Sequence, residues 1–209
     1  MPKRDYDLDQ AYTIEGPEDA QRLYGAWAES YDDRFGADWG YIAPREIAGL
    51  YRSAMTDADV PILDIGAGTG LVGEHLSDLT VDAFDITPEM LAIARGKGIY
   101  RDLIQGDLTK SLDLADDSYG GVISSGTFTH GHVGPECLPE LLRTVRPGGL
   151  FCCGTIAPVL DGAAFGSVLA QMVAKGTIDP VRFAEIEIYD KSHHRHADDR
   201  GLVMIFRKR

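Results

Sequence analysis

The sequence predicts an α/β fold in which a doubly wound, mostly parallel sheet of seven strands ends in an antiparallel hairpin. Short apolar runs alternate with helix-like segments between Val60 and Pro158. That alternation is typical of parallel strands joined by crossover helices. Two further strand-like runs, 182–192 and 201–209, have no helix between them, which predicts an antiparallel pair.

The N-terminal part of the chain is expected to be helical. Residues 1–16 are polar and are expected to lie loosely across the surface. A helix is expected from Pro17, because proline suits the first helical position and acidic residues follow it. Leu23, Trp27 and Tyr31 recur every fourth residue and would share one apolar face of this helix.

A second helix is expected over about 44–55, where Ile47, Leu50 and Tyr51 fall on one face. Residues 1–56 are therefore predicted to form a helical cap, followed by a core that spans 57–209. The total length of 209 residues suits one structural domain.

The core is expected to begin with five parallel strands. Each is a short apolar run bounded by glycine, proline or polar residues, and the five lie within 60–66, 80–87, 100–109, 119–130 and 150–158. Helices are expected between and after them, with proline or glycine at their ends, over 71–77, 88–98, 135–149 and 163–176.

Composition narrows the range of partners. The chain has 20 Lys and Arg against 33 Asp and Glu, a net charge of −13, so its field repels nucleic-acid backbones and anionic membranes. The three cysteines form no CxxC pair, which indicates reduced thiols. The N-terminus has no apolar signal region, and no apolar run approaches the ~20 residues needed to cross a bilayer. We therefore expect a cytoplasmic protein with no nucleic-acid or membrane partner.

The glycine cluster after the first strand fits two patterns. Gly66, Gly68 and Gly70 form G-x-G-x-G, whereas Gly68, Gly70 and Gly73 form the dinucleotide pattern G-x-G-x-x-G. The first glycine of a dinucleotide loop belongs at the turn where the strand ends, which is Gly66. That register requires a glycine at the position of Leu71, so the first pattern is favoured.

Three acidic residues surround this loop. Asp85 follows the first glycine by 19 positions, where a carboxylate can bind the ribose of either kind of cofactor. Asp107 ends the third strand, where a carboxylate can accept from an adenine amino group. Asp64 lies two residues before the first glycine, where it could face an ammonium group of a ligand, directly or through water.

Four motifs carry a family resemblance. The segments "ILDIGAGTG", "FDITPEML", "IQGDL" and "LLRTVRPGG" resemble, in order and over residues 60–155, the motifs of class I S-adenosylmethionine (SAM)-dependent methyltransferases. More narrowly, "WAESYD", "GAGTGLVGEHL" and "GTFTHGHVGPECL" resemble the Williams–Beuren-region methyltransferase-like proteins. The resemblance implies a Rossmann-like methyltransferase fold with N-terminal helices over the cofactor site, and SAM as the cofactor bound by the core.

The resemblance also implies roles for individual residues. Gly66, Gly68 and Gly70 would line the methionine part of SAM, and Asp85 would hold the ribose. The residues implied to flank the ribose or adenine, or to lie near the methyl group, are Ile86, Met90, Asp107, Leu108, Ser124 and Ser125.

Aromatic residues of the first helix have two interpretations. A stripe that contains Trp27 and Tyr31 is commonly a packing face, but an aromatic face beside a sulfonium gains cation–π attraction. Both residues are candidates for cofactor contact, and Tyr24 and Tyr41 are less favoured ones.

Histidines supply the candidate base. His130 and His132 follow the fourth strand, at the edge where open parallel sheets bind ligands. Either could accept a proton from a nucleophile, or both could simply bond to the backbone of a tight loop. No metal site is expected there, and the "HHRH" tract at 193–196 is expected to be a solvated turn.

The sequence therefore predicts in-line methyl transfer from SAM to a small-molecule acceptor. The acceptor atom (O, N, C or S) and the need for a base stay open. Two alternatives remain: a SAM-binding protein without transferase activity, and a nicotinamide-dependent oxidoreductase.

Overall fold

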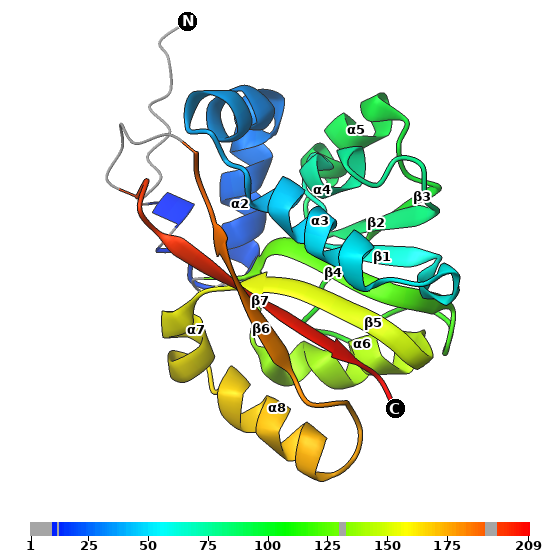
Figure 1. Cartoon of the computed structure of the whole chain (residues 1–209). Helices are drawn as coiled ribbons and strands as arrows, with labels where there is room; N and C mark the ends of the chain where they lie inside the picture. Colours follow the sequence, from blue (N-terminus) through cyan, green and yellow to red (C-terminus); the bar gives the residue numbers. More distant parts are fainter. Residues whose placement is uncertain (1–9, 12, 130–132, 191–195) are drawn as a thin grey trace, which may run out of the picture.

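The computed structural model describes residues 10–11, 13–129, 133–190 and 196–209. A seven-stranded sheet with the order β3-β2-β1-β4-β5-β7-β6 crosses the molecule (Figure 1). Its strands are β1 Ile62–Ile65, β2 Val81–Asp85, β3 Asp102–Gln105, β4 Tyr119–Phe128, β5 Val145–Thr155, β6 Arg182–Glu187 and β7 Arg200–Arg207.

Strands β1 to β5 pair in parallel, and β7 runs antiparallel between β5 and β6. The predicted fold class and the final hairpin are therefore confirmed. Strands β2 and β3 follow one another on one side of β1, and β4 lies on the other side of β1. That reversal makes the carboxyl ends of β1 and β4 the topological switch point, where open α/β sheets bind their ligands.

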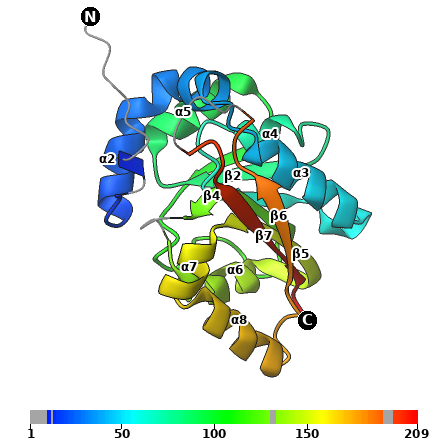
Figure 2. The same cartoon turned by 60° about the vertical axis from the view of Figure 1, so that its left-hand side comes forward.

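Helices cover both faces of the sheet (Figures 1 and 2). Residues of α3 and α4 pack on one face and residues of α6 and α8 on the other, while α5 packs beside β2 and β3. The helices are α2 Pro17–Trp27, α3 Ala43–Ala54, α4 Leu71–Glu74, α5 Pro88–Lys97, α6 Leu138–Thr144, α7 Ala157–Gly162 and α8 Phe165–Ala174. None of the helices in the described part of the chain has the length and apolarity needed to span a bilayer.

Neighbouring residues of a strand pack on opposite faces of the sheet. In β1, Ile62 packs with the α3 side, and Leu63 packs with the α6 side. In β5, Cys152 and Cys153 divide in the same way, because successive side chains of a strand point to opposite faces. Both cysteines are free and buried and act as small core residues, and burial raises the pKa of Cys152 to about 12.

Two helices differ from their predicted lengths at the N-terminal side of the core. The first ends at Trp27, and a 3₁₀ turn, Ala28–Ser30, and a π-helical segment, Asp32–Asp38, follow it. Tyr31 therefore does not continue the stripe of α2. The helix after the glycine loop is a single turn, Leu71–Glu74.

The pattern of the Pro-Gly-Gly segment, residues 147–149, predicts the end of a helix. In the structure this segment does not end a helix. Helix α6 stops at Thr144, and Pro147 lies inside β5. The pairing of β4 with β5 jumps from Tyr119–Val145 to Gly121–Leu150. Residues 146–149 therefore bulge out of the ladder, where proline needs no hydrogen-bonded amide.

Candidate functional site

A pocket opens over the carboxyl ends of β1, β2, β3 and β4, which is the switch point of the sheet. We call it the glycine-loop pocket. It holds about 930 Å³ of space, part of it open to solvent. Its wall is formed by Gly66, Ala67, Gly68, Thr69, Leu71, Val72, Phe84, Asp85, Ile86, Thr87, Met90, Gly106, Asp107, Leu108, Ser125, Gly126, Thr127 and Val133, with Pro17, Ala20, Tyr24, Tyr31, Tyr41 and Pro44 from the N-terminal segments.

The glycine loop adopts a backbone that side chains disfavour. Gly66, Gly68 and Gly70 have φ values of +64°, +56° and +94°, in the left-handed region that glycine enters without strain. A Cβ on Gly66 would lie 2.1 Å from Thr127 Oγ1, whereas a Cβ on Gly68 would meet no atom within 4 Å. Gly66 and Gly68 line the pocket, and Gly70 does not. Gly70 instead caps α4 beside the ring of Tyr100.

Gly73 is a packing residue, as the chosen glycine register predicts. It is buried in α4, and a Cβ there would lie 2.5 Å from the ring of Tyr100. Its small size therefore allows the ring of Tyr100 to pack against this helix.

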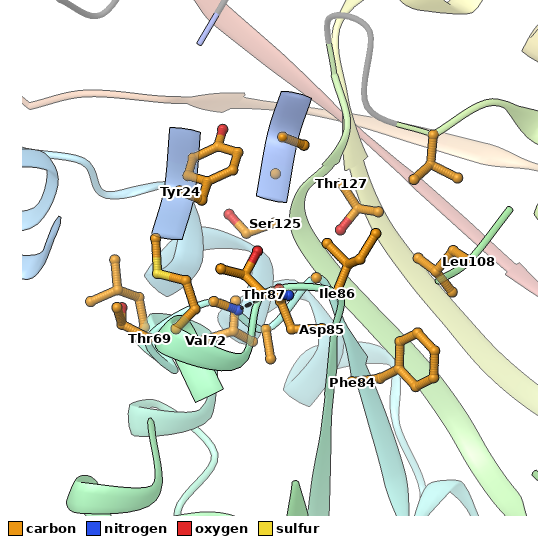
Figure 3. Close-up of a pocket in the computed structure, with 18 of the residues that line it drawn as sticks. Tyr24, Thr69, Val72, Phe84, Asp85, Ile86, Thr87, Leu108, Ser125 and Thr127 are labelled. Atoms are coloured by element: carbon orange, nitrogen blue, oxygen red, sulfur yellow. Dashed lines mark hydrogen bonds between the residues drawn. The ribbon is translucent and has the colours of Figure 1, made fainter. Parts of the chain in front are cut away.

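Asp85 is fixed at the end of β2 by two backbone amides. Its Oδ2 accepts from the Gly68 amide at 2.7 Å, and its Oδ1 accepts from the Thr87 amide at 2.8 Å (Figure 3). Burial raises the pKa of Asp85, although the two amide hydrogen bonds act in the opposite direction. The carboxylate thus joins the glycine loop to the start of α5, and it keeps acceptor capacity toward the pocket.

The pocket has one end at α4 and another at β3. Thr69 and Val72 lie at one end, and Phe84 and Leu108 lie at the other (Figure 3). Ile86 and Met90 also line the pocket, and Met90 is buried. An apolar slot between such side chains suits a flat ring.

Asp107 lines the pocket but also makes a local turn. Its Oδ1 accepts from the amide and the hydroxyl of Thr109 at 2.9 and 2.7 Å, and its Oδ2 lies 3.0 Å from Lys110 Nζ. Burial raises the pKa of Asp107, but these contacts outweigh it and hold the pKa below its usual range. Asp107 therefore stabilises a local turn and also has a place on the pocket wall.

Asp64 lies beneath the loop and not on the pocket wall. It is fully buried, its Oδ2 accepts from Tyr100 Oη at 2.7 Å, and its Oδ1 has no partner among the described residues. The pKa of Asp64 is raised to about 7, and burial is the largest cause. The nearby Asp85 also raises this pKa, whereas the Tyr100 hydrogen bond lowers it. A cation above the loop would favour the charged form of this carboxyl.

The two candidate serines are separated by the pleat of β4. Ser125 lines the pocket, and its Oγ lies 2.8 Å from Tyr41 Oη. Ser124 is buried off the wall, and its Oγ has no partner in the described structure. Of this pair, only Ser125 is placed to meet a ligand in the glycine-loop pocket.

Some aromatic candidates of the N-terminal segments line the pocket and one does not. Tyr31 and Tyr24 line the pocket. Trp27 is buried in a cluster with Ala11 and Tyr189, so the structure places it away from the pocket wall. The packing interpretation of the stripe holds for Trp27, because this side chain packs against Ala11 and Tyr189.

The candidate base lies outside the described residues, since these exclude His130 and His132. In the described ranges, no group of three His, Cys, Asp or Glu side chains is arranged to hold a metal ion. His196 is the one member of the "HHRH" histidines that is described, and its Nδ1 lies 3.0 Å from Asp199 Oδ2.

A second pocket adjoins the first on the side of β5, β6 and β7. We call it the tyrosine pocket. It holds about 680 Å³ of space, part of it open to solvent. Its wall is formed by Ala11, Tyr24, Tyr31, Tyr41, Ala43, Ile47, Ser125, Gly126, Thr129, Gly154, Thr155, Ile156, Ile186, Ile188, Tyr189 and Gly201.

Sequence reasoning missed several contributors. Thr127 lines the glycine-loop pocket, and its hydroxyl donates to the Ile65 carbonyl at 2.7 Å. Thr69 also lines it and donates to Asp32 at 2.5 Å, while Lys97 Nζ lies 2.6 Å from the same Asp32. These contacts tie the N-terminal segment to the core across long sequence distances, which no local motif reports.

Comparisons with known proteins agree with this geometry. Residues 63–153 match the family model described as a methyltransferase domain. The chain is 34% identical over 90 residues to a demethylmenaquinone methyltransferase of Renibacterium salmoninarum, an alignment that covers 42% of this chain and 38% of that protein. It is 31% identical over 131 residues to a malonyl-[acyl-carrier protein] O-methyltransferase of Pectobacterium atrosepticum, covering 62% and 50%. The chain thus spans half or less of the length of these two relatives.

Solved structures share the fold. A TehB-like SAM-dependent methyltransferase from Corynebacterium glutamicum superposes with a TM-score of 0.63 at 22% identity, covering 88% of this chain and 99% of that one. The [4+2]-cyclase SpnF superposes with a TM-score of 0.67 at 14% identity, covering 94% and 98%. The predicted seven-stranded architecture is therefore one that known proteins adopt over nearly their full length.

Proposed function

We propose that this chain, whose residues 63–153 match the family model of a methyltransferase domain, binds SAM and transfers its methyl group to a small-molecule acceptor. The observation that carries the proposal is the charge and the backbone geometry of the glycine-loop pocket. The charged residues that line it are Asp85 and Asp107, and no Lys or Arg is among its described lining residues.

This lining fits SAM better than a dinucleotide. SAM carries a sulfonium and an ammonium group, so acidic surroundings favour its binding. The pyrophosphate of a nicotinamide dinucleotide carries two negative charges and would meet no Lys or Arg among the described residues of the wall. Helix α4 has only four residues, so its dipole offers little compensation.

In this proposal, each part of SAM would contact described residues. The backbone at Gly66 and Gly68 is open to the methionine part, and a side chain at Gly68 would enter space that no protein atom occupies. Asp85 would accept from the ribose hydroxyls while its two amide hydrogen bonds hold it in place. Leu108 and Phe84 would pack on the adenine, and Asp64 would face the ammonium from beneath the loop.

SAM, when bound, supplies a methyl group on a sulfonium; transfer breaks that S–C bond, forms a bond from the methyl carbon to the acceptor atom and leaves S-adenosylhomocysteine. The chain's own task is to position the acceptor and to exclude water, since proximity supplies much of such an acceleration. We propose that residues 1–56 act as the cap that closes this site, with Tyr24 and Tyr31 over the cofactor. His130 or His132 would accept a proton where the acceptor is protonated when bound.

A side-by-side titration tests the cofactor. We expect S-adenosylhomocysteine to bind at micromolar or tighter concentrations by calorimetry and NADH to bind at least a hundredfold more weakly. Equal affinities, or a preference for NADH, would remove the proposal. Mass spectrometry of an acceptor screen with SAM then tests transfer. Tight SAM binding without any methylated product would support the alternative, a SAM-binding protein that is not a transferase.

A further inference from the structure

The tyrosine pocket shares a wall with the glycine-loop pocket. Tyr24, Tyr31, Tyr41, Ser125 and Gly126 line both. A molecule in the tyrosine pocket is therefore separated from a ligand of the glycine loop by single side chains and not by a layer of protein. Two ligands bound side by side across this wall could react with each other.

The tyrosine pocket has no charged side chain among its described lining residues. Its part beyond the shared wall is mainly aliphatic, with Ile47, Ile156, Ile186 and Ile188. A charged ligand would lose its water there and gain no ion pair, and such desolvation is strongly unfavourable. The described part of the wall therefore favours an uncharged ligand, although the chain as a whole is strongly acidic.

Aromatic rings form much of the remaining wall. Tyr24 and Tyr31 contact each other edge to face with ring centroids 6.1 Å apart, and Tyr41 and Tyr189 lie 5.8 Å apart. Such surfaces favour a flat aromatic ligand over a saturated one of equal size, because edge and face contacts add to burial. Burial raises the pKa of Tyr31 and of Tyr41, so both phenols keep their protons at neutral pH.

A polar pair marks the junction of the two pockets. Tyr41 Oη lies 2.8 Å from Ser125 Oγ, and the two hydroxyls belong to residues 84 positions apart in the chain. A hydroxyl both donates and accepts, so this pair can hold the hydroxyl of a ligand at the boundary with the glycine-loop pocket.

We propose that the tyrosine pocket is the acceptor site and that it takes an uncharged aromatic compound with a hydroxyl group, which the Tyr41–Ser125 pair holds at the junction. This inference rests on the proposed function for its catalytic meaning. Tyr41 and Ser125 are in this sense positioning residues for the acceptor.

Three probes of similar size test the ligand class. They are 1-naphthol, its saturated counterpart decahydro-1-naphthol, and the anion 1-naphthoate. Each is titrated by calorimetry into the full chain saturated with S-adenosylhomocysteine. We expect 1-naphthol to bind at least tenfold more tightly than 1-naphthoate and several-fold more tightly than decahydro-1-naphthol. Equal binding of 1-naphthol and 1-naphthoate, or a preference for the anion, would overturn the inference.

A charge introduced into the wall supplies a gain-of-binding test. Thr129 is half-buried on the wall of the tyrosine pocket, so Thr129→Lys adds a cation there. We expect it to tighten 1-naphthoate binding at least fivefold and not to tighten 1-naphthol. Thr177→Lys is the matched control, since Thr177 is exposed between α8 and β6 and lines neither pocket. If the two variants bind 1-naphthoate alike, the inference fails; thermal melting verifies that both are folded.

The two proposals fail in different ways. Absence of S-adenosylhomocysteine binding would remove the proposed function, whereas titration of 1-naphthol into the protein alone would still report on the tyrosine pocket. Normal S-adenosylhomocysteine binding together with no preference among the three probes would remove only the acceptor class.

Discussion

The two pockets meet at one wall but are constructed differently. The glycine-loop pocket is formed mainly by turns that follow β1, β2, β3 and β4, and its described wall carries two carboxylates, those of Asp85 and Asp107. The tyrosine pocket collects side chains from Ala11 to Gly201 and has hydroxyls as its polar groups. One region is set by backbone geometry near the strand ends, and the other by the packing of distant segments.

This difference assigns separate tasks to the two sides. A pocket whose key groups are fixed by short turns binds the same ligand as long as those turns persist. A pocket lined by side chains can change its preference by single substitutions, without altering the turns. We therefore expect variants of the first region to change cofactor binding or folding, and variants of the second to change acceptor binding.

The largest expected effect concerns Asp85. Asp85→Ala removes two hydrogen bonds to a charged acceptor, which stabilise the loop by about 1.5–3 kcal/mol each at most, and it removes the ribose contact. We expect S-adenosylhomocysteine affinity to fall on the order of a hundredfold, measured by calorimetry.

Asp113→Ala is the control for this change of charge, because Asp113 is exposed and lines neither pocket. The control should bind S-adenosylhomocysteine like the wild type. An Asp85→Ala protein with affinity within twofold of the wild type would contradict the assignment. Equal loss of 1-naphthol binding in that variant would break the separation of the two regions.

The next effect is a pH dependence of stability, caused by Asp64 beneath the glycine loop. The pKa of Asp64 is raised by burial to about 7, whereas an unfolded aspartate has a pKa of about 3.9. The folded chain therefore retains a proton that the unfolded chain has released, and stability falls as pH rises from about 4 to about 7.

Asp64→Asn removes this titration and retains an acceptor for the Tyr100 hydroxyl. We expect its stability relative to the wild type to be higher at pH 8 than at pH 5 by roughly 2 kcal/mol, measured by chemical denaturation at both pH values. A difference that is the same at the two pH values would show that Asp64 does not titrate in this range.

Alanine substitutions at two glycines of the same loop should separate an effect on stability from an effect on cofactor binding. Alanine at either Gly66 or Gly68 adopts a left-handed backbone, which costs about 1 kcal/mol. At Gly66 the new methyl group also clashes with Thr127 Oγ1, so we expect a total loss of about 2 kcal/mol. Gly68→Ala should lose about half of that but weaken S-adenosylhomocysteine several-fold. Identical denaturation curves for the two variants would contradict the clash.

The smallest expected effect is a change in stability at Thr155, on the wall of the tyrosine pocket. The hydroxyl of Thr155 is buried without a described partner, whereas that of Thr144 donates to the Leu141 carbonyl at 2.9 Å. Thr155→Val should therefore stabilise the chain by up to about 1 kcal/mol and Thr144→Val should destabilise it by about 1 kcal/mol. Thermal melting gives both signs, and a loss of stability in Thr155→Val would show that its hydroxyl is satisfied.

The glycine side was the more predictable of the two. The strand that ends at Ile65 and the requirement for glycine at three left-handed positions are properties of adjacent residues. Likewise, Asp85 ends β2, Asp107 lies two residues beyond the end of β3, and both line the pocket. The fold class and the final hairpin were confirmed because strand and helix periodicity repeats along the chain.

The exceptions depend on tertiary contacts. Helical spacing cannot tell whether Trp27 faces the pocket or the cluster with Tyr189, because both lie beside α2. The Pro-Gly-Gly segment is a strong helix stop by itself, yet the partner strand β4 draws residues 146–149 into a bulge. The Tyr41–Ser125 pair joins segments 84 positions apart, so no local pattern announces it.

The place of β7 between β5 and β6 also sets an order of assembly. A chain emerging from the ribosome has delivered every strand of the glycine side once residue 128 is out. Strand β6 has no partner in the sheet until β7 arrives, so Ile186 and Gly201 reach the wall of the tyrosine pocket last. In chain order, the described wall of the glycine-loop pocket is therefore complete at Val133, whereas the described wall of the tyrosine pocket needs Gly201.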